Sequence, residues 1–273
     1  MPHDSDADHH AGLARDLQIL SARLDRRRLL EWAAYLGATA LGCSGSAASS
    51  GSDAGTSASN LADDGSCSAI PQETEGPYPG DGTNGPNALG LSGIVRSDIT
   101  SSIAGATGVA GGIPLEVRLR LMDTSCTPLP GFALYLWHCD REGRYSMYSS
   151  GAENENYLRG VQEADDDGVV TFTTIFPACY TGRWPHIHFE IYESLAAASS
   201  GQNAVKTSQL ALPEEACDEV FDTSGYQASI QNLARLTLET DGIFRDGVTL
   251  QLASITGDVN SGYVATLDVA VAI

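Results

Sequence analysis

The stretch "RWPHIHF", residues 183–189, places two histidines one residue apart among apolar neighbours. Alternate side chains of an extended strand share a face, so His186 and His188 would point the same way. Two imidazoles on one face could bind one metal ion. A half-buried strand that turns two polar side chains toward solvent would show the same pattern. The two histidines alone therefore leave both interpretations open.

Two tyrosines strengthen the metal interpretation. Tyr145 lies in "WHCDREGRYSMY", just after a predicted strand, and Tyr180 lies in "FPACYTGRWPHIHF", shortly before His186. A lone tyrosine mostly serves packing, and its phenol has a pKa of about 10. A phenol therefore binds a metal at neutral pH only when the ion is acidic enough to displace the proton, as Fe(III) is and Zn²⁺ generally is not. The set favours a ferric site over a zinc or copper site on the histidines alone.

The body of the chain reads as strands. In "PLEVRLRLMD", residues 114–123, apolar and polar side chains alternate, which is typical of a half-buried strand. Similar runs, separated by Gly, Pro, Asp and Asn turns, occupy residues 132–139, 169–176, 186–192, 248–257 and 262–273. One helix is expected over residues 226–238. We predict an all-β fold, an antiparallel β-sandwich with long loops and one or two short helices.

An acidic run interrupts the strands at Asp165–Gly168, "DDDG". A calcium loop needs a longer pattern of acidic ligands than this run supplies. We therefore interpret it as a hairpin turn that leads into the strand beginning at Val169.

The N-terminal part differs in composition from the rest. Residues 1–43 resemble an export signal of the twin-arginine type, with Arg26 and Arg27 ahead of an apolar run that is too short to span a bilayer. "ALGC", ending at Cys43, resembles a lipoprotein cleavage box. An ordinary amphipathic helix is the alternative. Residues 44–66 read as a disordered Gly/Ser/Ala linker, which leaves residues 67–273 as the folded domain. We expect an extracytoplasmic protein, secreted or lipid-anchored through Cys43.

Net charge and the positions of the cysteines indicate which partners and which disulfides the protein could have. The formal net charge is −20, and no basic stripe follows the N-terminal arginines, so nucleic acid is excluded as a partner on electrostatic grounds. Five of the six cysteines lie beyond the linker, where an oxidising compartment would permit disulfides. We predict a bond between Cys179 and Cys217; the alternative is that the cysteines are small buried apolar residues.

Six motifs in order carry a resemblance to a known family. They are "TEGPY" (74–78), "RSDI" (96–99), "LWHCDREGRYS" (136–146), "YLRGVQEADDDG" (157–168), "TIFPACYTGRWPHIHF" (174–189) and "TSQLALP" (207–213). In this order they resemble the intradiol ring-cleavage dioxygenases of the protocatechuate 3,4-dioxygenase and catechol 1,2-dioxygenase type. The likeness runs from about Cys67 to the C-terminus. It is strongest to the exported, single-domain branch, because no helical dimerisation segment precedes the motifs.

The resemblance implies a set of iron ligands. Tyr145, Tyr180, His186 and His188 would bind Fe(III), with Tyr145 and His186 equatorial and the other two axial. Tyr180 would be the ligand that substrate displaces, and it would help to accept the second proton of the substrate. The protein would then cleave a catechol-type ring between its two hydroxylated carbons with O2, giving a diacid of the muconate type.

The resemblance also implies residues around the substrate. Arg183 would stabilise negative charge that develops on the ring, and Gln209 would lie near the bound substrate. Trp137 would pack behind the iron, while Pro77 and Tyr78 would line the mouth of the site. The alternative is a surface-tethered, non-catalytic sandwich that binds aromatic or carbohydrate ligands in the same pocket.

Overall fold

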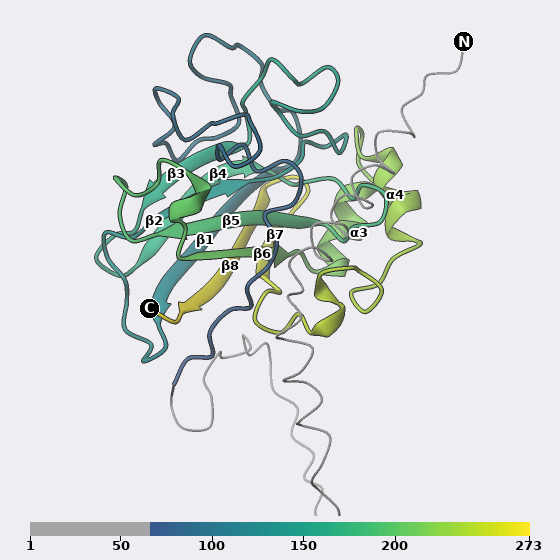
Figure 1. The fold of residues 1–273 in the computed structure, drawn as a ribbon. Coiled ribbons are helices and arrows are strands. Elements are labelled where there is room, and N and C mark those ends of the chain that lie inside the picture. Colours follow the sequence, from purple (N-terminus) through teal and green to yellow (C-terminus); the bar gives the residue numbers. More distant parts are fainter. Residues whose placement is uncertain (1–65) are drawn as a thin grey trace, which may run out of the picture.

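A computed structural model of the chain describes residues 66–273, which form two facing four-stranded sheets (Figure 1). One sheet has the order β4-β1-β8-β7 and consists of β4 (Val169–Ile175), β1 (Pro114–Asp123), β8 (Gly262–Val271) and β7 (Ser254–Asp258). The other has the order β3-β2-β5-β6 and consists of β3 (Arg159–Glu163), β2 (Ala133–Trp137), β5 (His186–Tyr192) and β6 (Lys206–Ala211). The predicted β-sandwich is confirmed. The predicted export signal, the linker up to residue 65 and Cys43 lie outside the described residues.

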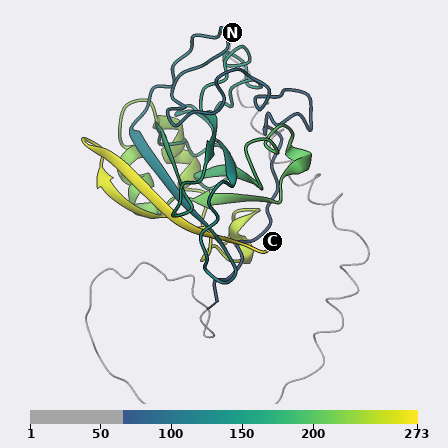
Figure 2. The ribbon, with the colours of Figure 1, turned by 90° about the vertical axis from the view of Figure 1, so that its left-hand side faces the viewer.

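The sandwich is antiparallel except at one pairing. β1 and β8 run parallel, with Leu115 opposite Tyr263 and Leu121 opposite Val269, while every other pair among the named strands is antiparallel. Strands joined by a tight turn must be antiparallel, but β1 and β8 lie far apart in sequence and are free of that constraint. Figure 2 shows the sandwich from the side.

The core lies between the sheets. β1 buries alternate residues, and its inward side chains Leu115, Val117, Leu119 and Leu121 are almost completely inaccessible. Ile187 and Phe189 of β5 belong to the same apolar cluster, so both histidines of this strand point away from it. Every residue of β5 is nevertheless buried. The histidines thus share one face, as predicted, and that face is covered by protein rather than turned to solvent.

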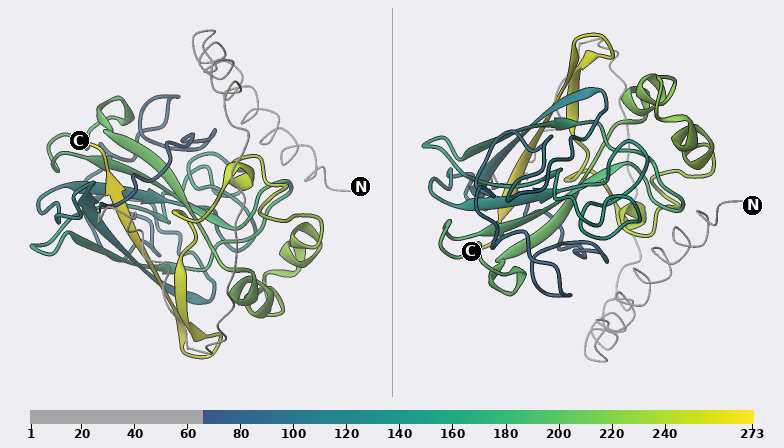
Figure 3. Two further views of the ribbon diagram at one scale, coloured as in Figure 1. Left: turned by 90° about the horizontal axis from the view of Figure 1, so that it is seen from below. Right: turned by 90° about the horizontal axis from the view of Figure 1, so that it is seen from above.

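Two α-helices and two short 3-10 helices complete the described fold. They are α3 (Glu214–Phe221), α4 (Gln227–Leu233), η1 (Gly201–Asn203) and η2 (Phe244–Asp246). Figure 3 shows α3 and α4 together beside one end of the sandwich. The helix predicted over residues 226–238 ends at Leu233, because the chain turns from Ala234 onward. Between residues 66 and 273 no helix has the length and apolar character needed to cross a membrane.

The turn at Asp165–Gly168 is present, but it does not close a hairpin. The Asp165 carboxylate accepts hydrogen bonds from the backbone N–H groups of Asp167 and Val169, and Gly168 adopts a φ of 78°. β3 before the turn and β4 after it belong to different sheets. The chain uses this turn to pass from one layer of the sandwich to the other.

The predicted Cys179–Cys217 disulfide is wrong. The structure joins Cys67 to Cys126, with the two Cα atoms 5.3 Å apart, while Cys139, Cys179 and Cys217 are buried free thiols. The Cys179 thiol donates to the carbonyl of Arg183 at 3.4 Å, and burial raises its pKa to about 12. The buried-apolar alternative therefore holds for these three residues.

The disulfide gives a prediction about stability. It closes a loop of 59 residues, so its loss should free the unfolded chain and lower the free energy of unfolding by about 2–4 kcal/mol. Urea denaturation of the C67S/C126S variant should show this loss. A reductant should destabilise the wild-type chain by a similar amount and leave the double variant unchanged. An equal effect of reductant on both proteins would contradict the assignment.

Candidate active site

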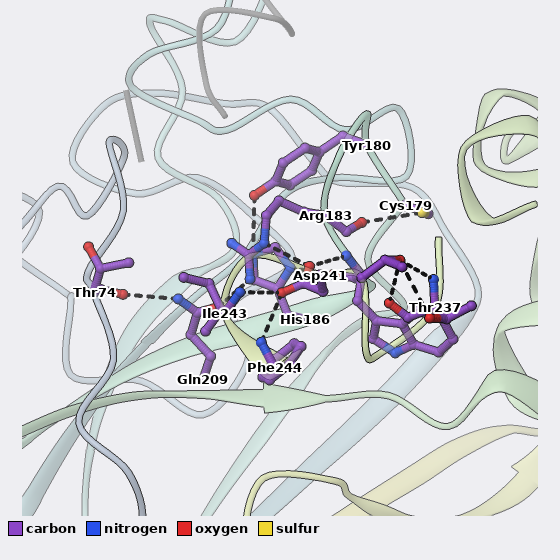
Figure 4. A network of polar contacts seen from close by, with 12 residues as sticks. Thr74, Cys179, Tyr180, Arg183, His186, Gln209, Thr237, Asp241, Ile243 and Phe244 are labelled. Atoms are coloured by element: carbon purple, nitrogen blue, oxygen red, sulfur yellow. Dashed lines mark hydrogen bonds and ion pairs between the residues drawn. The ribbon is translucent and has the colours of Figure 1, made fainter. Parts of the chain in front are cut away.

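Four side-chain donor atoms converge on the face of β5 that points away from the core. Tyr180 Oη and His188 Nε2 each lie 3.1 Å from His186 Nε2, and Tyr145 Oη lies 3.5 Å from both Tyr180 Oη and His186 Nε2. β5 supplies the two histidines, the loop after β2 supplies Tyr145, and the loop before β5 supplies Tyr180. Figure 4 shows Tyr180 pointing toward His186. All four residues predicted from the sequence as metal ligands are thus brought together.

The protonation of His186 turns a lone pair toward the cluster. His186 Nδ1 lies 2.5 Å from the carbonyl oxygen of Trp184, which can only accept, so this nitrogen carries the proton and Nε2 is bare. Burial and the nearby Arg183 charge lower the pKa of His186 well below its usual value. Burial, His186 and Arg183 do the same to the pKa of His188. Both imidazoles are therefore neutral, which is the form that binds metals.

The buried tyrosine needs a cation if it is to ionise. Tyr145 is 2% exposed, and burial, together with the neighbouring Tyr180, raises the pKa of its phenol well above 10. Arg183 acts in the opposite direction on the same pKa, but more weakly. A phenolate at this position therefore requires a strongly acidic ion in direct contact.

The donor set fits a metal ion. Ligands about 2.0–2.1 Å from one ion lie roughly 3 Å from one another, which is close to the spacing of His186 Nε2 from Tyr180 Oη and from His188 Nε2. Among residues 66–273, no group of three or more His, Cys, Asp or Glu side chains is placed to hold a metal. A metal at this place therefore depends on the tyrosine oxygens as well as on the two imidazoles.

The indole ring of Trp137 packs against the imidazole ring of His188. The register of β2 and β5 places Trp137 opposite His188, and the two rings stack with centroids 5.0 Å apart and planes 7° apart. Tyr135, two residues earlier on β2, also stacks on Trp137, with ring centroids 5.0 Å apart. The indole therefore fixes the plane of the His188 ring, in agreement with the predicted place of Trp137 behind the donor cluster.

Arg183 is held at the side of the cluster by buried polar groups (Figure 4). Its Nε donates to the carboxylate of Asp241 at 3.0 Å, and its second guanidinium nitrogen donates to Gln209 Oε1 at 2.7 Å. Gln209 Nε2 in turn donates to the carbonyl of Thr74. Arg183, Gln209 and Asp241 are each at most 1% exposed. The predicted pair Arg183 and Gln209 is therefore in direct contact, and Asp241 is an addition that sequence reasoning missed.

A segment near residue 78 borders the cluster. The ring of Tyr78 lies 5.0 Å from that of Tyr145, and Pro77 is buried next to it, with its carbonyl accepting from Asn84. Tyr78 thus packs against Tyr145, and its place at the mouth of the site stays a prediction. Arg159, also missed, fixes this segment.

The buried guanidinium of Arg159 donates to the carbonyls of Tyr78, Pro79 and Ser146, to the Ser146 hydroxyl and to the phenol of Tyr135. It therefore ties the segment around Tyr78 to the residue that follows Tyr145. The motif "YLRGVQEADDDG" contained Arg159 but gave no signal for this role, because its partners are backbone carbonyls distant in sequence.

Comparisons with known proteins agree with this geometry. A family model described as Dioxygenase matches residues 97–198, which include Tyr145, Tyr180 and both histidines. An intradiol ring-cleavage dioxygenase from Tetranychus urticae is 27% identical, with a TM-score of 0.58 over 76% of this chain and 95% of that chain. The chain is thus similar to an intradiol ring-cleavage dioxygenase in fold, and residues 97–198 match the dioxygenase family model.

Two sequence relatives carry more specific names. Chlorocatechol 1,2-dioxygenase of Rhodococcus opacus is 36% identical over 83 residues, and catechol 1,2-dioxygenase of Candida albicans is 32% identical over 80 residues. These stretches cover 27% and 28% of this chain. They span 32% and 26% of the two relatives, about a third or less of their length. The likeness supports a ring-cleaving dioxygenase without fixing the substrate.

The carboxyl group of Glu73 lies near Gln209 and has a raised pKa. Glu73 accepts from Gln251 Nε2 at 3.3 Å, and the same nitrogen donates to the backbone carbonyl of Gln209 at 3.1 Å. Burial, followed by the charge of Asp246, raises the pKa of Glu73 from 4.5 to about 7, although Gln251 and Arg183 lower it. The folded protein thus holds the Glu73 proton more tightly than the unfolded chain does.

This gives a prediction about pH. Stability contributed by protonated Glu73 is present below pH 4.5 and is lost as the pH rises through about 7. The E73Q variant, which cannot ionise, should therefore gain stability relative to wild type between pH 4.5 and pH 8, by at most about 3 kcal/mol. Chemical denaturation at several pH values measures this. E116Q, on β1, controls for the loss of one charge; a pH dependence shared by E73Q and wild type would contradict the assignment.

Proposed function

We propose that this protein is a non-haem Fe(III) intradiol dioxygenase that cleaves a catechol-type ring between its two hydroxylated carbons. The observation that carries the proposal is the convergence of two phenols and two neutral imidazoles within 3.1–3.5 Å. Tyr145, Tyr180, His186 and His188 would hold the ion. When bound, Fe(III) would draw electron density from a catecholate and make the ring reactive toward O2.

Exposure distinguishes the four donors. Tyr145, His186 and His188 are at most 3% exposed, whereas Tyr180 is partly exposed. An incoming diol can therefore reach Tyr180 more easily than the other three. This supports the assignment of Tyr180 Oη as the group that gives way to substrate and accepts one of its hydroxyl protons.

Arg183 would stabilise the negative charge of the bound substrate. Its guanidinium is permanently charged, buried, and held by Asp241 and Gln209, so it needs little reorganisation when negative charge develops on the ring. Burial is the largest influence on the pKa values of Tyr145 and both histidines, and the Arg183 charge acts to lower each of them, which supports an electrostatic effect of Arg183 on the cluster. Tyr78, packed against Tyr145, would cover the substrate from the side of the loops and exclude water.

The reaction balances without another reductant. Both atoms of O2 enter the product, one bond between ring carbons breaks, and the two oxygenated carbons become carboxyl groups. The product from catechol would be a muconate-type diacid.

We also propose that the protein acts outside the cytoplasm. The support is the export-like sequence of residues 1–43 together with the disulfide between Cys67 and Cys126, since disulfides persist mainly in oxidising compartments. A lipid anchor at Cys43 is part of this proposal.

Oxygen uptake tests the function. The iron-loaded protein should consume one O2 per substrate with one or more of catechol, protocatechuate, hydroxyquinol and chlorinated catechols. With ¹⁸O2, mass spectrometry should find one labelled oxygen in each new carboxyl group. No uptake with any of these diols would favour the non-catalytic binding protein, and a product with one acid and one aldehyde group would contradict intradiol cleavage.

Removal of one phenol tests the ligand set. The Y145F variant should lose most of its bound Fe(III) and the visible absorption that arises from phenolate-to-iron charge transfer, and its turnover should fall by at least about 100-fold because the ion is no longer held. The matched control is Y263F, since Tyr263 is also buried but lies on β8 and donates its hydroxyl to the Glu219 carboxylate. Unchanged iron content in Y145F would support a site on the two histidines alone.

A further inference from the structure

Asp241 is a completely buried carboxylate that lies far from the donor cluster in sequence. One of its oxygens accepts from Arg183 Nε at 3.0 Å and from the backbone N–H of Trp184 at 2.8 Å. The other accepts from the backbone N–H groups of Ile243 and Phe244 at 2.8 and 3.1 Å. Four donors from two segments thus meet on one side chain (Figure 4).

These contacts fix the guanidinium of Arg183 from several directions. Asp241 holds its Nε side, and Gln209 of β6 holds another nitrogen at 2.7 Å. The turn that Asp241 organises also brings the ring of Phe244 to within 5.9 Å of the guanidinium carbon. The carboxylate also accepts from the backbone N–H of Trp184, so both contacts hold the short segment that carries the guanidinium.

We propose that Asp241 is a positioning residue that aims the Arg183 charge at the substrate bound beside the tyrosine and histidine cluster. The proposal rests on the proposed dioxygenase function. Asp241 does not touch the donor atoms in the contacts described here, so it acts through Arg183. Removing it should leave the metal ligands in place and misdirect the cation.

The four N–H donors around the side chain of residue 241 require a carboxylate rather than an amide. Asparagine has one acceptor oxygen and one NH2 group, and both sides of Asp241 face two N–H donors. In either orientation the amide NH2 would meet two donors, and the buried Arg183 would lose its compensating charge. The D241N variant should therefore displace the guanidinium.

The kinetic test is a double-mutant cycle of D241N, R183Q and the two together. D241N should keep its iron and its visible charge-transfer band while kcat falls about 10- to 100-fold with a smaller change in KM. The double variant should be no slower than R183Q alone, because Asp241 acts only through Arg183. The proposal is wrong if D241N slows the R183Q protein by the same factor by which it slows the wild-type protein. It is also wrong if D241N leaves the kcat of the wild-type protein unchanged.

The matched control is D165N, which removes one carboxylate from the turn between β3 and β4. Asp165 also accepts two backbone N–H groups but lies on an exposed turn. Iron content, the visible band and kcat should all stay at the wild-type level in D165N. If D241N does not fold, D241E keeps the charge but displaces it by one methylene, and a kcat equal to wild type in D241E would then overturn the proposal.

An NMR measurement tests the contact between Asp241 and Arg183 without relying on enzymatic activity. The Arg183 Nε–H proton, assigned by its loss in R183Q, should give a slowly exchanging NMR signal in wild type and D165N and a rapidly exchanging one in D241N. Retention of slow exchange in D241N would show that Asp241 does not hold the guanidinium. An inactive wild type with this NMR pattern would refute the dioxygenase function while leaving the positioning contact intact.

Discussion

The site depends on an electrostatic constraint: lone pairs that are gathered among buried side chains are stabilised when they face a cation. His186 and His188 present Nε2 atoms 3.1 Å apart, and His186 Nε2 is bare because Nδ1 donates to the Trp184 carbonyl. The phenol oxygens of Tyr145 and Tyr180 complete the group, and burial disfavours the ionisation of Tyr145 and any charge on the imidazoles. A strongly acidic metal ion in contact with these atoms would stabilise two phenolates and accept the lone pairs of both imidazoles.

The sandwich creates this constraint through register and burial. β5 turns Ile187 and Phe189 into the core, so the strand period of two sends both histidines to the opposite face. Pairing with β2 places Trp137 against His188, and pairing with β6 places Gln209 opposite His188. The loops that carry Tyr145 and Tyr180 then cover this face. Rigid strands therefore hold the histidines and Gln209, while the partly exposed donor, Tyr180, comes from a loop.

The sequence predicts what is encoded in short patterns. The bounds of β1 and β5 agree with those predicted because alternation in β1 and the apolar residues around the His-x-His motif are local signals. β6 escaped prediction because its buried residues include Ser208 and Gln209, which carry no apolar signal. β7 begins at Ser254 rather than at residue 248, since the chain from 248 onward forms turns before the strand starts.

Contacts between residues far apart in the sequence could not be predicted from local patterns. The partner of Arg183 is 58 residues away, and the disulfide spans 59, so no spacing rule selects Asp241 or pairs Cys67 with Cys126. The ordered motifs of the family supplied the ligand set, whereas the groups that hold it in place came only from the fold.

The most direct test of the central claim is a resonance Raman spectrum of the Fe(III)-loaded protein, excited within its visible absorption band. The account predicts enhanced ring vibrations of iron-bound tyrosinate, present in wild type and weakened when either Tyr145 or Tyr180 is replaced by phenylalanine. A protein that binds Fe(III) tightly and shows no tyrosinate vibrations would contradict it.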